Sequence, residues 1–296
     1  MDFITHIQGN PDSRLTPLFL VHAISGLSIP YLHLKPLRKI NADGTICERP
    51  VYGINSPLYT SADFEMPSTF HDLAVLYVAE IKKTVRPNGP YLLGGWSMGG
   101  IIALKMGQIL LEQGEEVERV IMLDSPNPQT FPPFKSEVEH QALTEATYNQ
   151  SVAHKLAFAV DGTTSTDESE PSDEDDEDEG EAGTVRHVAN LTRKHIADSF
   201  LLFSNQPSET FLPEEKLGTH VVLIKCKTAL RIGETVLLNR SAYMLGYMRD
   251  KLMNWDTSRF RSFERIDFSG DHYGAFDAQY IDELSRIFCF ILRDVD

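Results

Sequence analysis

The sequence predicts an α/β fold with a mostly parallel sheet, flanking helices and one helical insertion. Two observations support this prediction. Short apolar runs of strand length alternate with segments of helical periodicity, an order that indicates parallel strands covered on both faces. A long stretch without such a strand, residues 126–218, contains helical patterns of its own. With 296 residues, 42% of them hydrophobic, the chain can build a sizeable core.

Six apolar runs predict buried strands. They are LTPLFLVH (15–22), VYGIN (51–55), PYLLGG (90–95), VERVIMLDS (117–125), HVVLIKC (220–226) and FERIDFS (263–269). Helical spacing of apolar residues predicts helices over Ser68–Arg86, with Ser68 as N-cap, over Gly99–Leu111 and over Ala278–Leu292. Because the strands alternate with helices, we expect the functional site at the carboxyl ends of the strands.

The insertion is longer than an ordinary crossover between two strands. Helical patterns cover Ser136–Ala159 and Arg186–Phe203 within it. We therefore predict three segments: a first part of the core (1–125), a helical lid (126–218) and a second part of the core (219–296).

Much of the net charge of −16 lies in one segment, DGTTSTDESEPSDEDDEDEGEAG, residues 161–183. This segment holds 12 of the 43 acidic residues and no basic one, so the rest of the chain carries only −4. Its apolar surface is too small to offset the entropy of ordering, and its charges repel one another, which predicts a disordered loop. A decoy for basic partners or a phosphorylation target around Ser165, Ser169 and Ser172 is the alternative.

Composition also excludes several classes of function. No basic patch interleaved with aromatic residues indicates a nucleic-acid partner. No apolar run is long enough for a membrane span, and residues 1–11 lack a secretory signal, so we expect a soluble cytoplasmic protein without a membrane partner. The cysteines, Cys47, Cys226 and Cys289, are scattered and odd in number, which matches neither a disulfide framework nor a metal site.

The segment Gly95-Trp96-Ser97-Met98-Gly99 matches the pattern G-x-S-x-G between a predicted strand and a predicted helix. In that setting the serine lies on a sharp turn at the carboxyl end of the sheet, close to the first amides of the helix. A glycine-rich turn with an incidental serine is the alternative. If Ser97 is catalytic, the residues that activate it must lie elsewhere in the chain.

A serine hydroxyl needs a general base, and the base needs an orienting carboxylate. His272 follows the last predicted strand in DFSGDHYGAF, and Asp124 ends the strand in VIMLDSP. The order Ser97, Asp124, His272 is the order of the α/β-hydrolase fold. Asp271 and Asp277 are rival carboxylates, although Asp271 adjoins His272 in sequence and is poorly placed to accept its ring N–H.

An oxyanion formed at Ser97 needs two backbone donors. The loop VHAISGLS after the first strand contains Gly26, which allows a sharp turn, so we expect the amides of Ile24 and Met98 to donate. His22 is expected to shape this loop. Further histidines fall in helical or lid patterns typical of surface or core residues: His33, His71, His140, His154, His187 and His195.

Five segments together resemble the fungal thioesterase family that releases products from polyketide and non-ribosomal peptide synthetases. They are PLFLVHAISGLSIPYLHLKPL, RPVYGINSP, GPYLLGGWSMGG, LDSP and GDHYGAF, so the similarity covers residues 15–125 and, less closely, 262–292. The resemblance implies Ser97 as nucleophile, Asp124 and His272 as its relay, and Ile24 and Met98 as oxyanion donors.

The resemblance also implies a substrate and a partner. The expected substrate is an acyl or peptidyl thioester on the phosphopantetheine arm of a carrier protein, in cis or in trans, and the enzyme needs no cofactor of its own. Ser97 would take the acyl group, which water or a nucleophile within the substrate then removes. A carboxylic-ester hydrolase without a carrier, or a catalytically silent binding module, are the alternatives.

A four-residue Gly/Ser linker in place of residues 161–183 is expected to leave the unfolding temperature unchanged or slightly raised. Loop entropy changes by only about 0.6 kcal/mol per doubling of length, and the replacement removes charge repulsion. Hydrolysis of a small soluble thioester should survive, because no expected catalytic residue lies in the segment. Calorimetry and a thioester assay test this; a folded variant that has lost the hydrolysis would place the segment in the active site.

Overall fold

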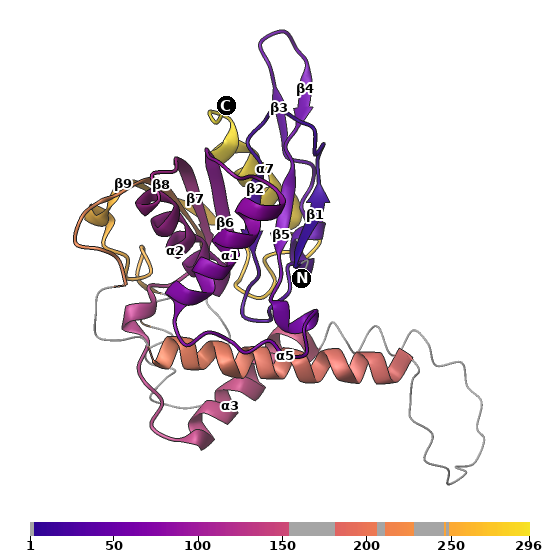
Figure 1. Ribbon diagram of the computed structural model, residues 1–296, viewed down its shortest axis with the longest axis vertical. Coiled ribbons are helices and arrows are strands. Elements are labelled where there is room, and N and C mark those ends of the chain that lie inside the picture. Colours follow the sequence, from indigo (N-terminus) through magenta and orange to yellow (C-terminus); the bar gives the residue numbers. More distant parts are fainter. Residues whose placement is uncertain (1–2, 154–180, 206–210, 228–245, 247–248) are drawn as a thin grey trace.

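The computed structural model describes residues 3–153, 181–205, 211–227, 246 and 249–296 (Figure 1). Seven strands form one sheet in the order β1-β5-β2-β6-β7-β8-β9. All neighbours are parallel except β1 and β5, so the predicted mostly parallel sheet is confirmed. The strands are β1 (Ile4–Gln8), β2 (Leu18–Val21), β5 (Val51–Ile54), β6 (Tyr91–Trp96), β7 (Val117–Leu123), β8 (Leu217–Cys226) and β9 (Phe260–Phe268).

Three strands lie outside the six predicted runs. Edge strand β1 is only partly buried, so it has no continuous apolar run. The hairpin of β3 (Arg38–Ile40) and β4 (Ile46–Glu48) protrudes from the core (Figure 1). The segment FERIDFS forms a strand as predicted, but the prediction that this strand is buried is wrong. In β9 only Phe260 and Phe268 are buried. The strand lies at the other edge of the sheet, where charged side chains are tolerated.

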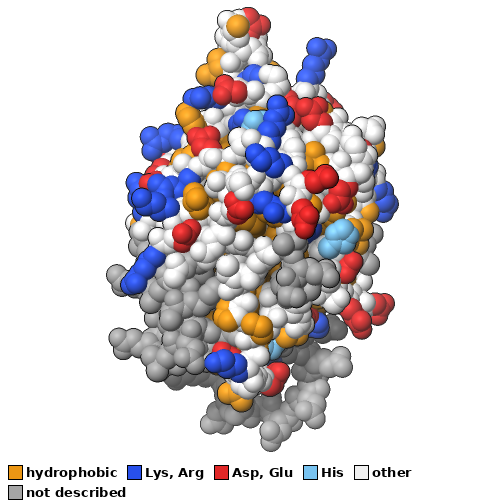
Figure 2. All heavy atoms as spheres, turned by 90° about the vertical axis from the view of Figure 1, so that its left-hand side faces the viewer, with side chains coloured by type: hydrophobic (Ala, Val, Ile, Leu, Met, Phe, Trp, Pro, Cys, Tyr) orange, Lys and Arg blue, Asp and Glu red, His pale blue; other side chains and the backbone are white. Residues whose placement is uncertain are grey.

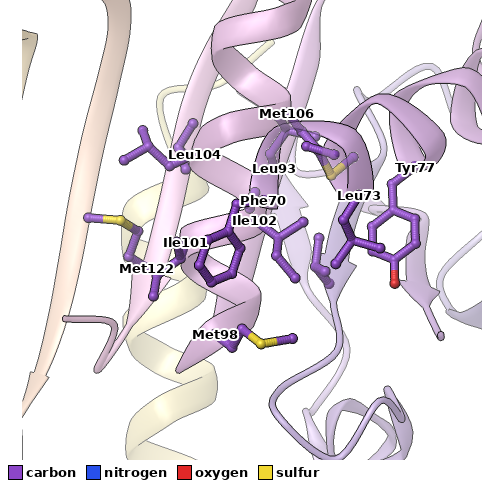
Figure 3. Packing of buried hydrophobic residues seen from close by; sticks show 14 of the residues in the cluster. Phe70, Leu73, Tyr77, Leu93, Met98, Ile101, Ile102, Leu104, Met106 and Met122 are labelled. Atoms are coloured by element: carbon purple, nitrogen blue, oxygen red, sulfur yellow. The ribbon is translucent and has the colours of Figure 1, made fainter. Parts of the chain in front are cut away.

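The sheet separates two apolar layers, and alternate residues of each central strand enter opposite layers. In β2, Phe19 and Val21 face the layer of α1 (Phe70–Thr84) and α2 (Met98–Glu112). Leu18 and Leu20 face the layer of α7 (Ile281–Leu292). Figure 3 shows the first layer, in which Phe70 and Leu73 of α1 lie near Ile101 and Ile102 of α2. Burial on both faces explains why these strands are continuously apolar.

Two helices of the core, α1 and α7, start two or three residues after their predicted starts. Helix α1 is capped by Thr69, whose hydroxyl accepts the N–H of Asp72 at 3.0 Å, so Ser68 is not the N-cap. Helix α7 begins at Ile281, because residues 274–280 form successive turns, with the N–H of Asp277 bonded to the carbonyl of Gly274. Both differences are of a few residues and leave the buried faces unchanged.

Between β7 and β8 the described residues form α3 (Glu137–Tyr148), a π-helical turn (Asn149–Ala153) and α5 (Glu181–Ser204). We call α3 and α5 the lid helices. Ser136 caps α3 as its sequence indicates, and residues from 154 of the first predicted lid helix lie outside the described residues. Figure 1 shows α5 lying across the end of the core, with α3 beside it.

The predicted acidic loop falls largely outside the described residues, which omit 154–180. Residues 181–183 belong to α5, so the loop prediction is wrong for its last three positions, and the helix extends further toward the N-terminus than the predicted start at Arg186.

Charges of both signs are interspersed on the described part of the face shown in Figure 2. None of the helices in the described ranges is long and apolar enough to cross a membrane.

Candidate active site

Ser97 occupies a strained turn between β6 and α2, with φ 57° and ψ −120°. Its N–H donates to the carbonyl of Leu123 at 2.8 Å. A Cβ atom at Gly95 would lie 2.2 Å from the carbonyl carbon of Gly99, and one at Gly99 would lie 2.2 Å from the oxygen of Val21. Only glycine fits at both positions, so the two glycines of the motif allow strand and helix to meet this closely.

Asp124 follows β7 and is 4% exposed, also with a positive φ of 48°. Its Oδ2 accepts a hydrogen bond from Nδ1 of His272 at 2.8 Å, and its Oδ1 accepts the N–H of Cys226 at 3.1 Å. Nζ of Lys225 lies 3.7 Å from Oδ1. The structure therefore brings Asp124 and His272 together, although they are far apart in sequence.

The surroundings of Asp124 favour its charged form. Burial by itself raises the pKa of the carboxyl, but the hydrogen bond from His272 and the charges of His272 and Lys225 lower it more. The net pKa lies below the usual value, so the carboxyl is ionised at neutral pH. Since a carboxylate only accepts hydrogen bonds, the bonded Nδ1 of His272 carries a proton, so Nε2 is the ring nitrogen that is available to act as a base.

The rival carboxylates have other partners. Asp271 accepts the N–H groups of Tyr273 at 3.0 Å and Gly274 at 2.8 Å, which closes the turn after β9. Among the described residues, neither Asp271 nor Asp277 hydrogen-bonds to the ring of His272. The ring packs instead near Trp96, with 5.6 Å between centroids.

Ser97 and His272 both line a cavity of about 240 Å³ at the carboxyl edge of the sheet. Within the described residues, neither the Ser97 hydroxyl nor Nε2 of His272 makes a hydrogen bond, so the cavity presents two unpaired polar atoms. The other lining residues are mostly apolar: Ala23, Ile24, Ser25, Leu27, Ile29, Pro30 and Trp96 from the core, Ser151, Val188 and Thr192 from the lid, and Tyr273.

The two expected oxyanion donors lie close to this serine in the fold. Ile24 lines the cavity on the tight turn after β2, and Met98 is the first residue of α2. Neither backbone N–H donates to another described residue. Their role as donors stays a prediction.

His22 and His195 form a buried pair behind that turn, with ring centroids 5.0 Å apart. Nδ1 of His22 donates to the carbonyl of Ala23 at 2.7 Å, and its Nε2 accepts from the hydroxyl of Tyr77 at 2.6 Å. His195 of α5 donates from Nδ1 to the carbonyl of Ile24 at 2.9 Å. Sequence reasoning missed this link, because no local pattern connects residues 171 positions apart.

Burial keeps both histidines neutral. It lowers the pKa of His22 to about 3, and the electrostatic interaction with His195 lowers it further. Burial likewise lowers the pKa of His195 to about 4, although its bond to Ile24 opposes the shift. For the described residues, no group of three or more His, Cys, Asp or Glu side chains could hold a metal ion.

Comparison with known proteins places these features in context. The sequence profile of the Thioesterase domain matches residues 16–213. Thioesterase pytI of Aspergillus terreus is 37% identical over 320 aligned positions that cover all of both chains. A non-reducing polyketide synthase, PKS16 of Cladonia grayi, is 39% identical over 128 residues, which are 43% of this chain and 6% of the synthase.

A crystal structure has the same fold. The NocB thioesterase domain, in covalent complex with a fluorophosphonate nocardicin G analog, matches with a TM-score of 0.62 and 20% identity, over 98% of this chain and 100% of that one. The mostly parallel sheet with flanking helices agrees with the α/β-hydrolase fold predicted from the sequence.

The buried histidines predict a pH-dependent stability. Between pH 6.5 and about 4 the unfolded chain binds protons on His22 and His195 that the folded chain does not bind. Their contribution to the free energy of unfolding is therefore complete above pH 6.5 and is lost as the pH falls toward the folded pKa values. When the pH is lowered from about 7 to 4.5, the free energy of unfolding of His195→Asn should fall by roughly 2 to 3 kcal/mol less than that of the parent.

Urea unfolding at several pH values measures this difference. Thr144→Ala, which removes a buried lid hydroxyl without a hydrogen-bond partner among the described residues and keeps both histidines, is the matched control and should retain the slope of the parent. Equal slopes for the parent and His195→Asn would contradict the prediction.

Proposed function

The chain belongs to the thioesterase domain family, and from this premise we propose that it cleaves acyl thioesters through a covalent intermediate on Ser97. The observation that carries the proposal is the 2.8 Å bond between Asp124 and His272 beside a cavity shared with Ser97. A positioned base with an ionised partner is what a serine hydroxyl needs to become a nucleophile.

In the proposed acylation, Oγ of Ser97 attacks the thioester carbonyl while Nε2 of His272 takes the hydroxyl proton. Asp124 stabilises the imidazolium that forms. The amides of Ile24 and Met98 donate to the oxyanion of the tetrahedral intermediate. When the intermediate collapses, the C–S bond breaks, and the leaving thiolate receives the proton from His272.

In the proposed deacylation, His272 removes a proton from water or from a nucleophile within the substrate. That nucleophile attacks the ester carbonyl on Ser97, the ester C–O bond breaks, and His272 returns the proton to Oγ. Water releases a free acid, whereas an internal nucleophile releases a cyclic product. The steps use only groups of the protein, so we propose that it needs no cofactor of its own.

We propose that the acyl group arrives on the phosphopantetheine arm of an acyl or peptidyl carrier, in cis or in trans. The proposal is supported by the relatives of this chain, which include a thioesterase that matches it end to end and a segment of a polyketide synthase. The apolar lining of the cavity suits an apolar acyl chain.

Two alternatives remain distinguishable from this proposal. A carboxylic-ester hydrolase would prefer an oxygen ester to a carrier thioester. A silent binding module would need no general base, so the bond between Asp124 and His272 disfavours it.

The test compares a carrier-loaded acyl thioester with an oxygen ester of the same acyl group, followed by mass spectrometry of Ser97. We expect faster turnover of the thioester and an acyl adduct on Ser97. Ser97→Ala should fold normally and lose turnover by about 10³-fold or more, because it lacks the nucleophile. Turnover within about tenfold of the parent would exclude Ser97 as nucleophile.

The two carboxylates near His272 give a second prediction. Asp124→Asn should lower kcat by up to about 10⁴-fold, because the ring loses its orienting partner and the charge that stabilises the imidazolium. Asp271→Asn is the matched control, since Asp271 lies next to His272 in sequence but bonds only backbone amides among the described residues. Steady-state kinetics on a small thioester measure both, and the reverse ranking would move the relay to Asp271.

A further inference from the structure

The turn after β2, residues Ala23–Gly26, has every backbone carbonyl fixed by a hydrogen bond. Gly26 has φ 82°, and its N–H closes the turn onto the carbonyl of Ala23 at 3.0 Å. The other donors come from three separate parts of the chain. They are Nδ1 of His22 to Ala23, Nδ1 of His195 to Ile24, the hydroxyl of Tyr59 to Ser25 at 2.5 Å, and the N–H of Ser56 to Gly26 at 2.7 Å.

These bonds determine where the N–H of Ile24 points. The carbonyl of Ala23 and the N–H of Ile24 belong to one planar trans peptide and point in opposite directions. His22 therefore sets the direction of that N–H by holding the carbonyl of Ala23. The carbonyl of Ile24 belongs to the next peptide plane, which His195 holds. Together the two histidines fix both peptide planes that flank the α-carbon of Ile24.

One of these two supports comes from the lid. His22 lies at the end of a core strand, whereas His195 lies on helix α5. Thr192, one turn earlier on α5, adds a second link, because its hydroxyl lies 3.0 Å from that of Tyr59. The packing leaves little space, since a Cβ atom at Gly26 would lie 2.7 Å from Cδ2 of His195.

We propose that His195 is a positioning residue: it holds the peptide plane that follows Ile24, and together with His22 it fixes the backbone on both sides of this residue so that the N–H of Ile24 meets the oxyanion formed at Ser97. Catalysis thereby depends on the docking of α5 against the turn. The inference rests on the proposed function, because the donor role of Ile24 is part of it. An oxyanion donor acts on charge that develops only in the transition state, so its misplacement lowers kcat and leaves substrate binding unchanged.

Three variants separate this role from a merely structural one. His195→Leu removes the donor to the carbonyl of Ile24, whereas in His195→Asn an amide nitrogen can occupy the place of Nδ1. His140→Leu is the matched control: His140 is also a buried lid histidine that bonds a backbone carbonyl, that of Ala197 at 2.8 Å, but it does not touch the turn.

With a small soluble acyl thioester, His195→Leu should lower kcat by roughly a hundredfold, with KM within about threefold of the parent. His195→Asn should recover most of that loss, to within about fivefold of the parent kcat. His140→Leu should keep kcat within about threefold, even where its thermal unfolding temperature falls as far as that of His195→Leu.

The inference is overturned if a folded His195→Leu protein has the same kcat as His140→Leu. It is also overturned if the kcat of His195→Leu is unchanged and only its KM rises. Should His195→Leu fail to fold, Tyr59→Phe decides, because it removes the hydroxyl that holds the carbonyl of Ser25 and contacts Thr192 of α5, and so weakens the docking of α5 against the same turn. A lower kcat with unchanged KM then supports the inference, and an unchanged kcat overturns it. Turnover by the parent protein distinguishes a failure of this inference from a failure of the proposed function. If the parent shows no turnover that depends on Ser97, the proposed function itself is wrong.

Discussion

The close contact of helix α2 with strands β2 and β6 is the constraint on which the rest of the site depends. It forces Ser97 into a backbone conformation that costs on the order of 1 to 3 kcal/mol for a residue with a side chain. The surrounding packing sustains this strain, because most of α2 is buried and the N–H of Ser97 is bonded to the neighbouring strand β7. Without glycine at positions 95 and 99, helix and strands could not approach closely enough to hold the turn.

The parallel sheet then decides which residues can join Ser97. Its strands end at one edge, so residues that follow β7 and β9 come together there although long segments of chain separate them. Asp124 and His272 meet in this way, and Lys225, which precedes the last residue of β8, brings a positive charge near the same carboxylate. The carboxylate stays ionised despite its burial because these two basic side chains surround it.

The sequence predicted the features that short-range patterns encode. The strand, turn and helix around Ser97 follow from apolar periodicity and two glycines, and the pairing of Asp124 with His272 follows from their places after parallel strands. Edge strand β1 and the β3–β4 hairpin were missed, because exposed edges need no continuous apolar run. The link between His195 and Ile24 was missed for a different reason: it depends on how α5 packs against the core, which no spacing within either segment records.

Strand β9 and the turn after it, which carries His272, follow all other strands of the sheet in the chain. A nascent chain that has emerged only as far as β7 contains the whole Ser97 turn, but neither α5 nor the turn that carries His272. The proposed nucleophile therefore lacks its proposed base until the last strand and the turn after it are present. The hydrogen bond between Asp124 and His272 can therefore form only after the sheet is complete.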